Sequence, residues 1–339
     1  MSPLVSIITP TYNHEKYISE CLQTIIDQTF KDWELIIVND GSTDGTVKAI
    51  EPFLSDKRIK LFSRKNVGIF RLKETYNYAL SHAKGKYIAV IEGDDLWEQD
   101  KLRLQVDTME RNPEAVLCWG RSRNVSADKK KIYGIYPDLE TDERFYYNND
   151  PIGCILNILF FHNCVPAQTT FFRKDVLLKI GGFQQAYGLP LVDLVTIQEF
   201  ATLGKFCFLE EPLSKWRMYA KQTTKTYPAE MMNGFYQLAK NNISRFKEKN
   251  DLAFSIDENK IDSYYKKQLV IAYSRSGRYK LIRKDFNDAR KDFKTSIIIN
   301  GFINPTWKLR SIVGYIFSLF HLNLEKLSKI MGRDNYLEE

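Results

Sequence analysis

The stretch from Lys86 to Trp97 constrains the fold of this chain more than any other part of the sequence. It contains an apolar run, Tyr87–Ile91, and then breaks around Gly93 into carboxylates. A continuous apolar run is typical of a buried parallel strand, and in open α/β sheets ligands bind beyond the carboxyl ends of such strands. The acidic residues either hold a hard divalent cation or form an ordinary acidic turn that caps the next helix.

Strand-like and helix-like segments alternate through the first hundred residues. Apolar, β-rich runs cover residues 4–9, 35–38, 59–62 and 87–91, and segments with helical periodicity lie between them. This alternation predicts βαβ units and an α/β fold with a doubly wound, mostly parallel sheet flanked by helices.

Polar side chains follow three of these predicted strands. The first strand is followed by Tyr12, the second by Asp40, and the fourth by Glu92, Asp94 and Asp95. Because the carboxyl ends of parallel strands share one edge of a sheet, we expect these residues to meet in one crevice. Together they suit a nucleoside diphosphate. The Tyr12 ring would stack on the base, Asp40 would accept hydrogen bonds from base or ribose, and the carboxylate cluster would hold a metal that binds the phosphates. Taken singly, each is also an ordinary rim or turn residue.

The length of 339 residues and the uneven charge predict two domains. Residues 1–225 carry 29 basic and 29 acidic side chains, whereas residues 226–339 carry 20 and 13, which accounts for the whole net charge of +7. A basic, helical C-terminal region could contact anionic lipid, an acidic partner or nucleic acid. Nucleic acid is the weakest of these, because no recognised nucleic-acid motif is present.

Several kinds of protein are disfavoured by what the sequence lacks. The five cysteines are scattered without a C-x-x-C pair, which argues against a disulfide framework or a zinc site and favours a reducing compartment. We expect neither a signal peptide nor a spanning helix, since the most apolar window, residues 312–320, is far shorter than the ~20 residues that a span requires. No dinucleotide-binding or P-loop glycine motif occurs.

An ordered set of motifs resembles the family 2 glycosyltransferases of the GT-A fold over about residues 3–224. The matching pieces are VSIITPTYN at 5–13, QTF at 28–30, WELIIVNDGSTD at 33–44, NVG at 66–68, Asn77, GKYI at 85–88 and EGDD at 92–95. The resemblance implies a GT-A domain at residues 1–225, with a nucleotide-sugar half at about 1–120 and an acceptor half at about 121–225. Residues 226–339 would then form a helical appendage.

The resemblance also implies a donor site for a nucleotide-sugar, usually a UDP-sugar. The implied donor-binding residues are Pro10, Tyr12, Asp40, Asn66, Asn77, Arg71, Glu92 and Asp95. Of these, Pro10, Tyr12 and Asp40 would cradle the nucleoside, and the two asparagines would shape the pocket. Arg71 or the nearby Lys73 would reach the pyrophosphate.

The metal ligands and the catalytic base follow from the same resemblance. Glu92 and Asp94 occupy the D-x-D metal motif, with Asp94 as the direct ligand of Mn²⁺ or Mg²⁺ and Glu92 touching either metal or ribose. Asp193 would be the catalytic base, since Gly204 follows it at the family's spacing of eleven residues. The residue before it is Val192, where the family usually has glutamate. From the sequence alone, Asp193 in its apolar run could equally cap a helix.

The function implied is an inverting, non-processive transfer of a sugar to an acceptor hydroxyl, on a glycan or a lipid-linked glycan. Processive synthases of this fold carry spanning helices and a Q-x-x-R-W motif, and neither is found here. We expect a cytoplasmic enzyme, either free or peripheral on the inner face of the plasma membrane through residues 226–339. Two alternatives remain open, a sugar-nucleotide binding module without turnover and a nucleotidyltransferase. The C-terminal helices could instead pack on the catalytic domain or form a homodimer.

Overall fold

The computed structural model of the chain has two compact units. It describes residues 2–186, 188–219, 222–249, 251–299 and 301–322. We call the first unit the sheet unit; it comprises Met1–Met218 and Phe246–Ser255. We call the second the helical unit; it comprises Tyr219–Arg245 and Ile256–Glu339. Each is described by itself.

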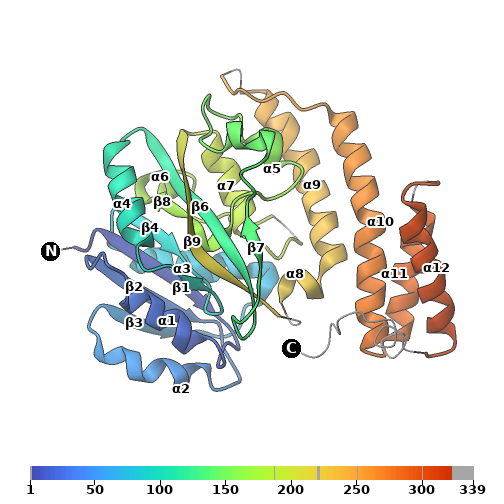
Figure 1. Ribbon diagram of the computed structural model, residues 1–339, viewed down its shortest axis with the longest axis horizontal. Helices are drawn as coiled ribbons and strands as arrows, with labels where there is room; N and C mark the ends of the chain where they lie inside the picture. The colour runs from blue at the N-terminus through green and yellow to red at the C-terminus, as the bar shows by residue number, and fades with distance from the viewer. Residues whose placement is uncertain (1, 187, 220–221, 250, 300, 323–339) are drawn as a thin grey trace. The chain divides into compact units, whose positions relative to one another are not determined.

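The described strands of the sheet unit form one nine-stranded mixed sheet (Figure 1). Its order is β3-β2-β1-β4-β8-β6-β9-β5, with β7 paired to β6. The first four strands in this order are parallel, β8 is antiparallel to both its neighbours, and β6 and β9 are parallel. The strands are β1 (Val5–Thr11), β2 (Trp33–Asn39), β3 (Ile59–Ser63), β4 (Tyr87–Val90), β5 (Leu96–Trp97), β6 (Ala115–Ser126), β7 (Ile132–Tyr136), β8 (Phe171–Arg173) and β9 (Lys205–Met218).

Helices cover both faces of the parallel strands. Alternate residues of a strand point to opposite faces, and the odd-numbered residues of β1 and β2 pack in one buried cluster with α1 and α4. Helix α3 contacts the same two strands from the other face. The helices of the sheet unit are α1 (Ile18–Ile26), α2 (Thr46–Ile50), α3 (Leu72–His82), α4 (Lys101–Arg111), α5 (Leu156–Leu159), α6 (Lys174–Lys179) and α7 (Asp193–Ala201), with 3₁₀ turns η1 (Glu51–Ser55), η2 (Ile69–Arg71), η3 (Asp142–Tyr146) and η4 (Ala167–Thr169).

The helical unit is built around three successive antiparallel helices. Helices α10 and α11 begin at capping side chains, Asp257 and Asp285, which accept hydrogen bonds from backbone N–H groups of the first turn. Phe293 of α11 is buried and forms a small core with Leu281 and Ala289. The helices are α8 (Thr223–Thr226), α9 (Pro228–Lys247, which ends in the sheet unit), α10 (Glu258–Ile282), α11 (Phe286–Ile298) and α12 (Pro305–Leu319).

This architecture confirms the predicted fold class. The alternating strands and helices of the first hundred residues form a mostly parallel sheet flanked by helices, and the C-terminal part of the chain is helical. Among the described residues, no helix combines the length and the apolar character that crossing a membrane requires.

Candidate active site

The ends of β1 and β2 bring Tyr12 and Asp40 to one edge of the sheet. The two strands pair in parallel with Thr11 opposite Asn39, so the residues that follow them are neighbours. The backbone N–H of Asp40 donates to the carbonyl of Thr11 at 2.9 Å. The Tyr12 side chain is 43% exposed and therefore accessible for stacking on a planar ligand. Tyr12 and Asp40 therefore follow adjacent strand ends, as the predicted strand order requires.

The carboxylate of Asp40 is buried and held by several hydrogen bonds. It accepts from the backbone N–H of Val67 at 3.2 Å and from the hydroxyl of Thr75 at 3.3 Å. Asn66 donates to the Asp40 backbone carbonyl at 2.8 Å, which joins two residues implied in donor binding. Gly41 has a φ of +73°, and a Cβ there would lie 2.7 Å from the backbone nitrogen of Asn66. The turn therefore requires glycine at this position.

The acidic loop, residues 92–95, follows β4 and packs against the end of β1. The backbone N–H of Gly93 donates to the carbonyl of Pro10 at 3.2 Å. A Cβ at Gly93 would lie 2.7 Å from the Thr11 hydroxyl and 2.8 Å from a ring nitrogen of His14. Only glycine allows this close approach, which places the acidic loop beside the strand end that carries Tyr12.

The carboxylates of the acidic loop perturb one another strongly. Burial and the charge of Asp94 raise the pKa of Glu92 to about 7, although the hydroxyl of Tyr76, which donates to Glu92 Oε1 at 2.8 Å, works against this rise. Burial and the charge of Asp94 also raise the pKa of Asp95 well above its ordinary value. The loop thus concentrates carboxyl groups in a place shielded from water, where several negative charges together are unfavourable.

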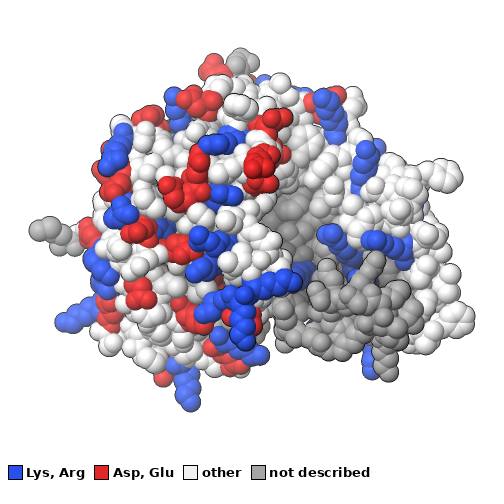
Figure 2. All heavy atoms as spheres, viewed as in Figure 1, with Lys and Arg blue, Asp and Glu red and all other residues white. Residues whose placement is uncertain are grey.

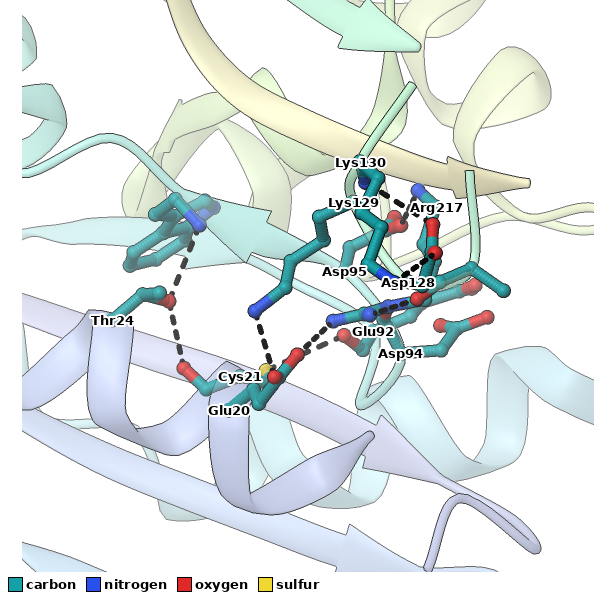
Figure 3. Close-up of polar contacts among 12 residues, drawn as sticks. Glu20, Cys21, Thr24, Glu92, Asp94, Asp95, Asp128, Lys129, Lys130 and Arg217 are labelled. Carbon is teal, nitrogen blue, oxygen red and sulfur yellow. Dashed lines mark hydrogen bonds and ion pairs between the residues drawn. The ribbon is translucent and has the colours of Figure 1, made fainter. Parts of the chain in front are cut away.

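Arg217, on β9, holds the acidic loop in place. Its side chain is 2% exposed. Its backbone N–H donates to Asp95 Oδ1 at 3.0 Å, and its Nε donates to the backbone carbonyl of Asp94 at 2.8 Å. The guanidinium also donates to the carbonyl of Ala127 and to Glu20 Oε2, each at 2.6 Å. Figure 3 shows Arg217 between the acidic loop and Glu20 on α1.

The hairpin between β6 and β7 also contacts α1. Lys129 Nζ forms an ion pair with Glu20 Oε1 at 2.7 Å, and Glu20 therefore bridges Lys129 and Arg217 (Figure 3). These two partners lower the pKa of Glu20, although its partial burial works in the opposite direction. The turn at residues 128–131 therefore lies beside Arg217 and Glu20.

Asp193 is the first residue of α7 and lies within electrostatic reach of the acidic loop. Its charge raises the pKa of both Tyr76 and Glu92. Burial raises the pKa of Asp193 itself, while Asn163 donates to its Oδ2 at 2.7 Å and works against that rise. Because Asn163 is anchored through its carbonyl to the hydroxyl of Tyr136, it orients the Asp193 carboxylate.

Two predicted donor-binding residues use their polar groups elsewhere. Asn77 exchanges two hydrogen bonds with the backbone of Phe183, donating at 2.9 Å and accepting at 2.8 Å. Asn77 therefore ties α3 to the loop after α6. Arg71 is paired with Glu74 by two hydrogen bonds at 2.7 and 2.9 Å, and its side chain is 65% exposed. An exposed pair of this kind is weak, so the guanidinium can exchange Glu74 for another anion.

The donor set of the acidic loop fits a divalent cation that also binds a ligand. Carboxylate oxygens suit Mg²⁺ and Mn²⁺, and a cation would relieve the repulsion that raises the pKa of Glu92. Among the described residues, however, no three His, Cys, Asp or Glu side chains form a ready metal cage. Mg²⁺ commonly takes only one or two protein carboxylates and completes its shell with phosphate oxygens and water. Asp94, with Glu92, would hold a cation in this manner.

Sequence reasoning did not identify Tyr76, Asn163 or the network of Glu20 and Lys129. Tyr76 and Asn163 lie far in sequence from the carboxylates that they contact, and neither belongs to a local motif. Arg217 lies in the part of the sequence that continues the family resemblance after Asp193, but nothing in the sequence indicated its contacts with the acidic loop.

Comparisons with known proteins agree with the geometry. The family model described as "Glycosyl transferase family 2" matches residues 6–171. An uncharacterized glycosyltransferase of Haemophilus influenzae is 29% identical over 252 residues, covering 73% of this chain and 75% of the relative. A chondroitin synthase of Pasteurella multocida is 36% identical over 135 residues, which cover 40% of this chain and only 14% of the synthase.

Two solved structures share the fold at low sequence identity. S. aureus TarS in complex with UDP-GlcNAc superposes with a TM-score of 0.55 and 16% identity, covering 98% of this chain and 93% of that one. The mannosyltransferase PcManGT from Pyrobaculum calidifontis, in complex with GDP-Man and Mn²⁺, superposes with a TM-score of 0.55 and 15% identity, covering 94% and 88%. Residues 6–171 of this chain therefore form a glycosyl transferase family 2 domain, and the chain is a glycosyltransferase with the GT-A fold.

Proposed function

We propose that this enzyme is a metal-dependent, inverting, non-processive glycosyltransferase that moves a sugar from a UDP-sugar to a hydroxyl of a glycan or lipid-linked glycan. The observation that carries the proposal is the shared sheet edge at the ends of β1, β2 and β4, which brings together the strand ends that carry Tyr12, Asp40 and the acidic loop. A single base suits one displacement, in which it activates the acceptor on the face away from the leaving group, and Asp193 is the residue proposed for this role.

The roles proposed for the residues follow from their positions. Tyr12 stacks on the base, and Asp40 with Asn66 contacts the nucleoside from the neighbouring strand end. Asp94 would hold the cation, which when bound would supply positive charge to offset the charge that gathers on the departing nucleoside diphosphate. Asp193 takes the proton from the acceptor hydroxyl as the new glycosidic bond forms.

The raised pKa of Asp193 supports its assignment as the base. Burial makes this carboxylate a stronger base than an exposed aspartate, and Asn163 holds one of its oxygens at a fixed position. Positioned general bases contribute about 10²–10⁴-fold to reaction rates. Glycosidases use two carboxylates that flank the bond, whereas here the cation would replace the acid.

The first experiment measures release of free nucleoside diphosphate from UDP-sugars and GDP-mannose, with Mn²⁺, Mg²⁺ or EDTA. The neighbouring structures contain UDP-GlcNAc and GDP-Man, so both nucleotides belong in the panel. We expect slow, metal-dependent hydrolysis of a UDP-sugar by the wild type. Asp94→Asn should lose metal-dependent donor binding in calorimetry. Asp193→Asn should retain donor binding and lose about 10²–10⁴-fold in turnover.

Asp107→Asn is the matched control, because this aspartate lies on α4 with an exposed side chain. It should behave as wild type. Full turnover by Asp193→Asn would show that another group is the base. Hydrolysis that persists in EDTA would overturn the metal requirement, and preferred turnover of GDP-mannose would overturn the assignment of uridine.

A further inference from the structure

Helix α12 in the helical unit buries a polar and small-residue face. The positions of α12 that are buried against the helical unit are Lys308, Ser311, Gly314 and Ser318. Their spacing of three and four residues defines one side of a helix. The hydroxyl of Ser311 donates to that of Ser296 on α11 at 2.8 Å. A Cβ at Gly314 would collide with the ring of Phe293, so α12 approaches α11 closely at this point.

The buried lysine of this face is satisfied within the unit. Lys308 Nζ donates to three backbone carbonyls at the end of α11 and in the turn that follows, those of Ile297 at 2.8 Å and of Ile299 and Gly301 at 2.5 Å. The inward face of α12 therefore has its polar groups paired, and Tyr315 and Phe317 pack against the small core around Phe293. The aliphatic side chains of the helix lie on the opposite side.

The outward face of α12 is apolar and exposed. Its side chains recur at helical spacing and continue beyond the helix end, and they are Leu309 (62% exposed), Ile312 (42%), Val313 (39%), Ile316 (46%), Leu319 (45%) and Phe320 (69%). Figure 2 shows the surface over α12 as largely free of acidic and basic side chains. A helix at the surface of a globular protein normally has the reverse arrangement, with its apolar stripe inward. An exposed apolar patch of this kind marks an interaction site.

The charges around this face select its partner. Residues 299–322 contain two basic side chains, Lys308 and Arg310, and no acidic one. Lys308 is engaged internally, whereas the guanidinium groups of Arg310 and Arg275 lie over the Trp307 ring at 4.6 and 5.4 Å from its centroid. Tryptophan and arginine beside an apolar helix face are typical of the boundary between lipid headgroups and acyl chains.

We propose that the outward face of α12 docks on an anionic membrane surface, with the helix lying in the plane of the interface. The helix has 15 residues, fewer than the ~20 that a span needs. A second copy of this chain would present the same face, and its α12 offers no acidic side chain to pair with Arg310. Anionic lipid supplies both an apolar layer and negative charge. The proposal does not depend on which donor the enzyme uses.

The test is co-sedimentation of the full chain with vesicles of phosphatidylcholine alone or mixed with phosphatidylglycerol. We expect wild type to bind the mixed vesicles more tightly than the neutral ones. The double variant Ile312→Gln with Ile316→Gln should lose about tenfold or more in binding, because two apolar side chains leave the acyl boundary. Arg310→Gln should weaken binding to the anionic vesicles by about fivefold and leave binding to the neutral vesicles unchanged.

The matched control is the double variant Leu54→Gln with Leu178→Gln, which removes two comparably exposed leucines from the sheet unit. It should bind vesicles as wild type does, and helical content by circular dichroism should be unchanged in every variant. Vesicle binding that the Ile312 and Ile316 changes leave intact would overturn the proposal. A second result would also overturn it: the wild type does not bind vesicles but is a dimer in lipid-free ultracentrifugation, and the Ile312 and Ile316 changes make that dimer monomeric.

Discussion

Lys101 is a lysine buried completely in the sheet unit, at the start of α4. Its Nζ donates to Gln105 Oε1 at 2.5 Å and lies 4.1 Å from the centroid of the Trp97 ring. Burial lowers its pKa from the ordinary 10.5 to about 7, because the charged form loses its hydration. Above about pH 7, Lys101 therefore loses its proton in the folded protein, whereas the same lysine in the unfolded chain keeps it up to about pH 10.5.

The pH dependence of stability follows from this difference. Between about pH 7 and 10.5 the unfolded state binds the extra proton, so Lys101 makes the free energy of unfolding rise with pH by up to about 1.4 kcal/mol per unit. We expect Lys101→Met to remove this contribution, while Gln105 loses a partner at every pH. Urea unfolding of the sheet unit at pH 7, 8 and 9 measures it: the variant's stability relative to wild type should decline steadily with rising pH. Parallel curves would show that Lys101 stays charged in the folded protein across this pH range, as it does in the unfolded chain.

Arg217 acts at the scale of elements, because its bonds join β9 to the acidic loop, to the β6–β7 hairpin and to α1. Arg217→Lys keeps the charge, but a single ammonium cannot reach three acceptors that the guanidinium fork reaches together. We expect the acidic loop to shift, with a loss of about ten- to hundredfold in kcat. Mn²⁺ binding should weaken together with kcat. Electron paramagnetic resonance of the free Mn²⁺ ion measures this binding.

The control for this prediction is Arg103→Lys, which alters an arginine in exposed pairs with Asp100 and Asp107. It should change neither Mn²⁺ binding nor kcat. Glu20→Gln, which removes only the more exposed partner of Arg217, should have a smaller effect than Arg217→Lys. Equal effects from Arg217→Lys and Arg103→Lys would show that the acidic loop is held without Arg217.

At the scale of the whole molecule, the division into two compact units predicts two unfolding transitions. The residues proposed to bind donor and metal all belong to the sheet unit. A ligand that binds only the folded sheet unit stabilises that unit, by about 2.7 kcal/mol at a hundredfold excess over its Kd. In differential scanning calorimetry, UDP with Mn²⁺ should therefore raise the midpoint temperature of one transition and leave that of the other unchanged.

Asp94→Asn provides the control, since the same ligands should then move neither transition. A single transition that shifts as a whole on ligand addition would contradict the prediction and show that the two units unfold together.

Local sequence patterns were sufficient to predict the fold and which strand ends share one edge of the sheet. The periods of the apolar residues distinguished strands from helices, and the parallel sheet required the strand ends carrying Tyr12, Asp40 and the acidic loop to share an edge. At this edge the backbone of Gly41 packs closely against Asn66, and the backbone of Gly93 packs closely against Thr11 and His14. The roles of the site residues remain predictions, which the variants above address.

The doubly wound architecture and the acidic loop could be predicted from the amino-acid sequence, because both depend on residues that are close together in the chain. Only the packed structure shows which distant groups contact that loop: Tyr76 from α3 and Arg217 from β9. It also decided the inward face of α12, because the ring of Phe293 leaves room on the neighbouring helix only for Gly314. Side-chain spacing predicts which residues share a face, but only the packed neighbours determine which face is buried.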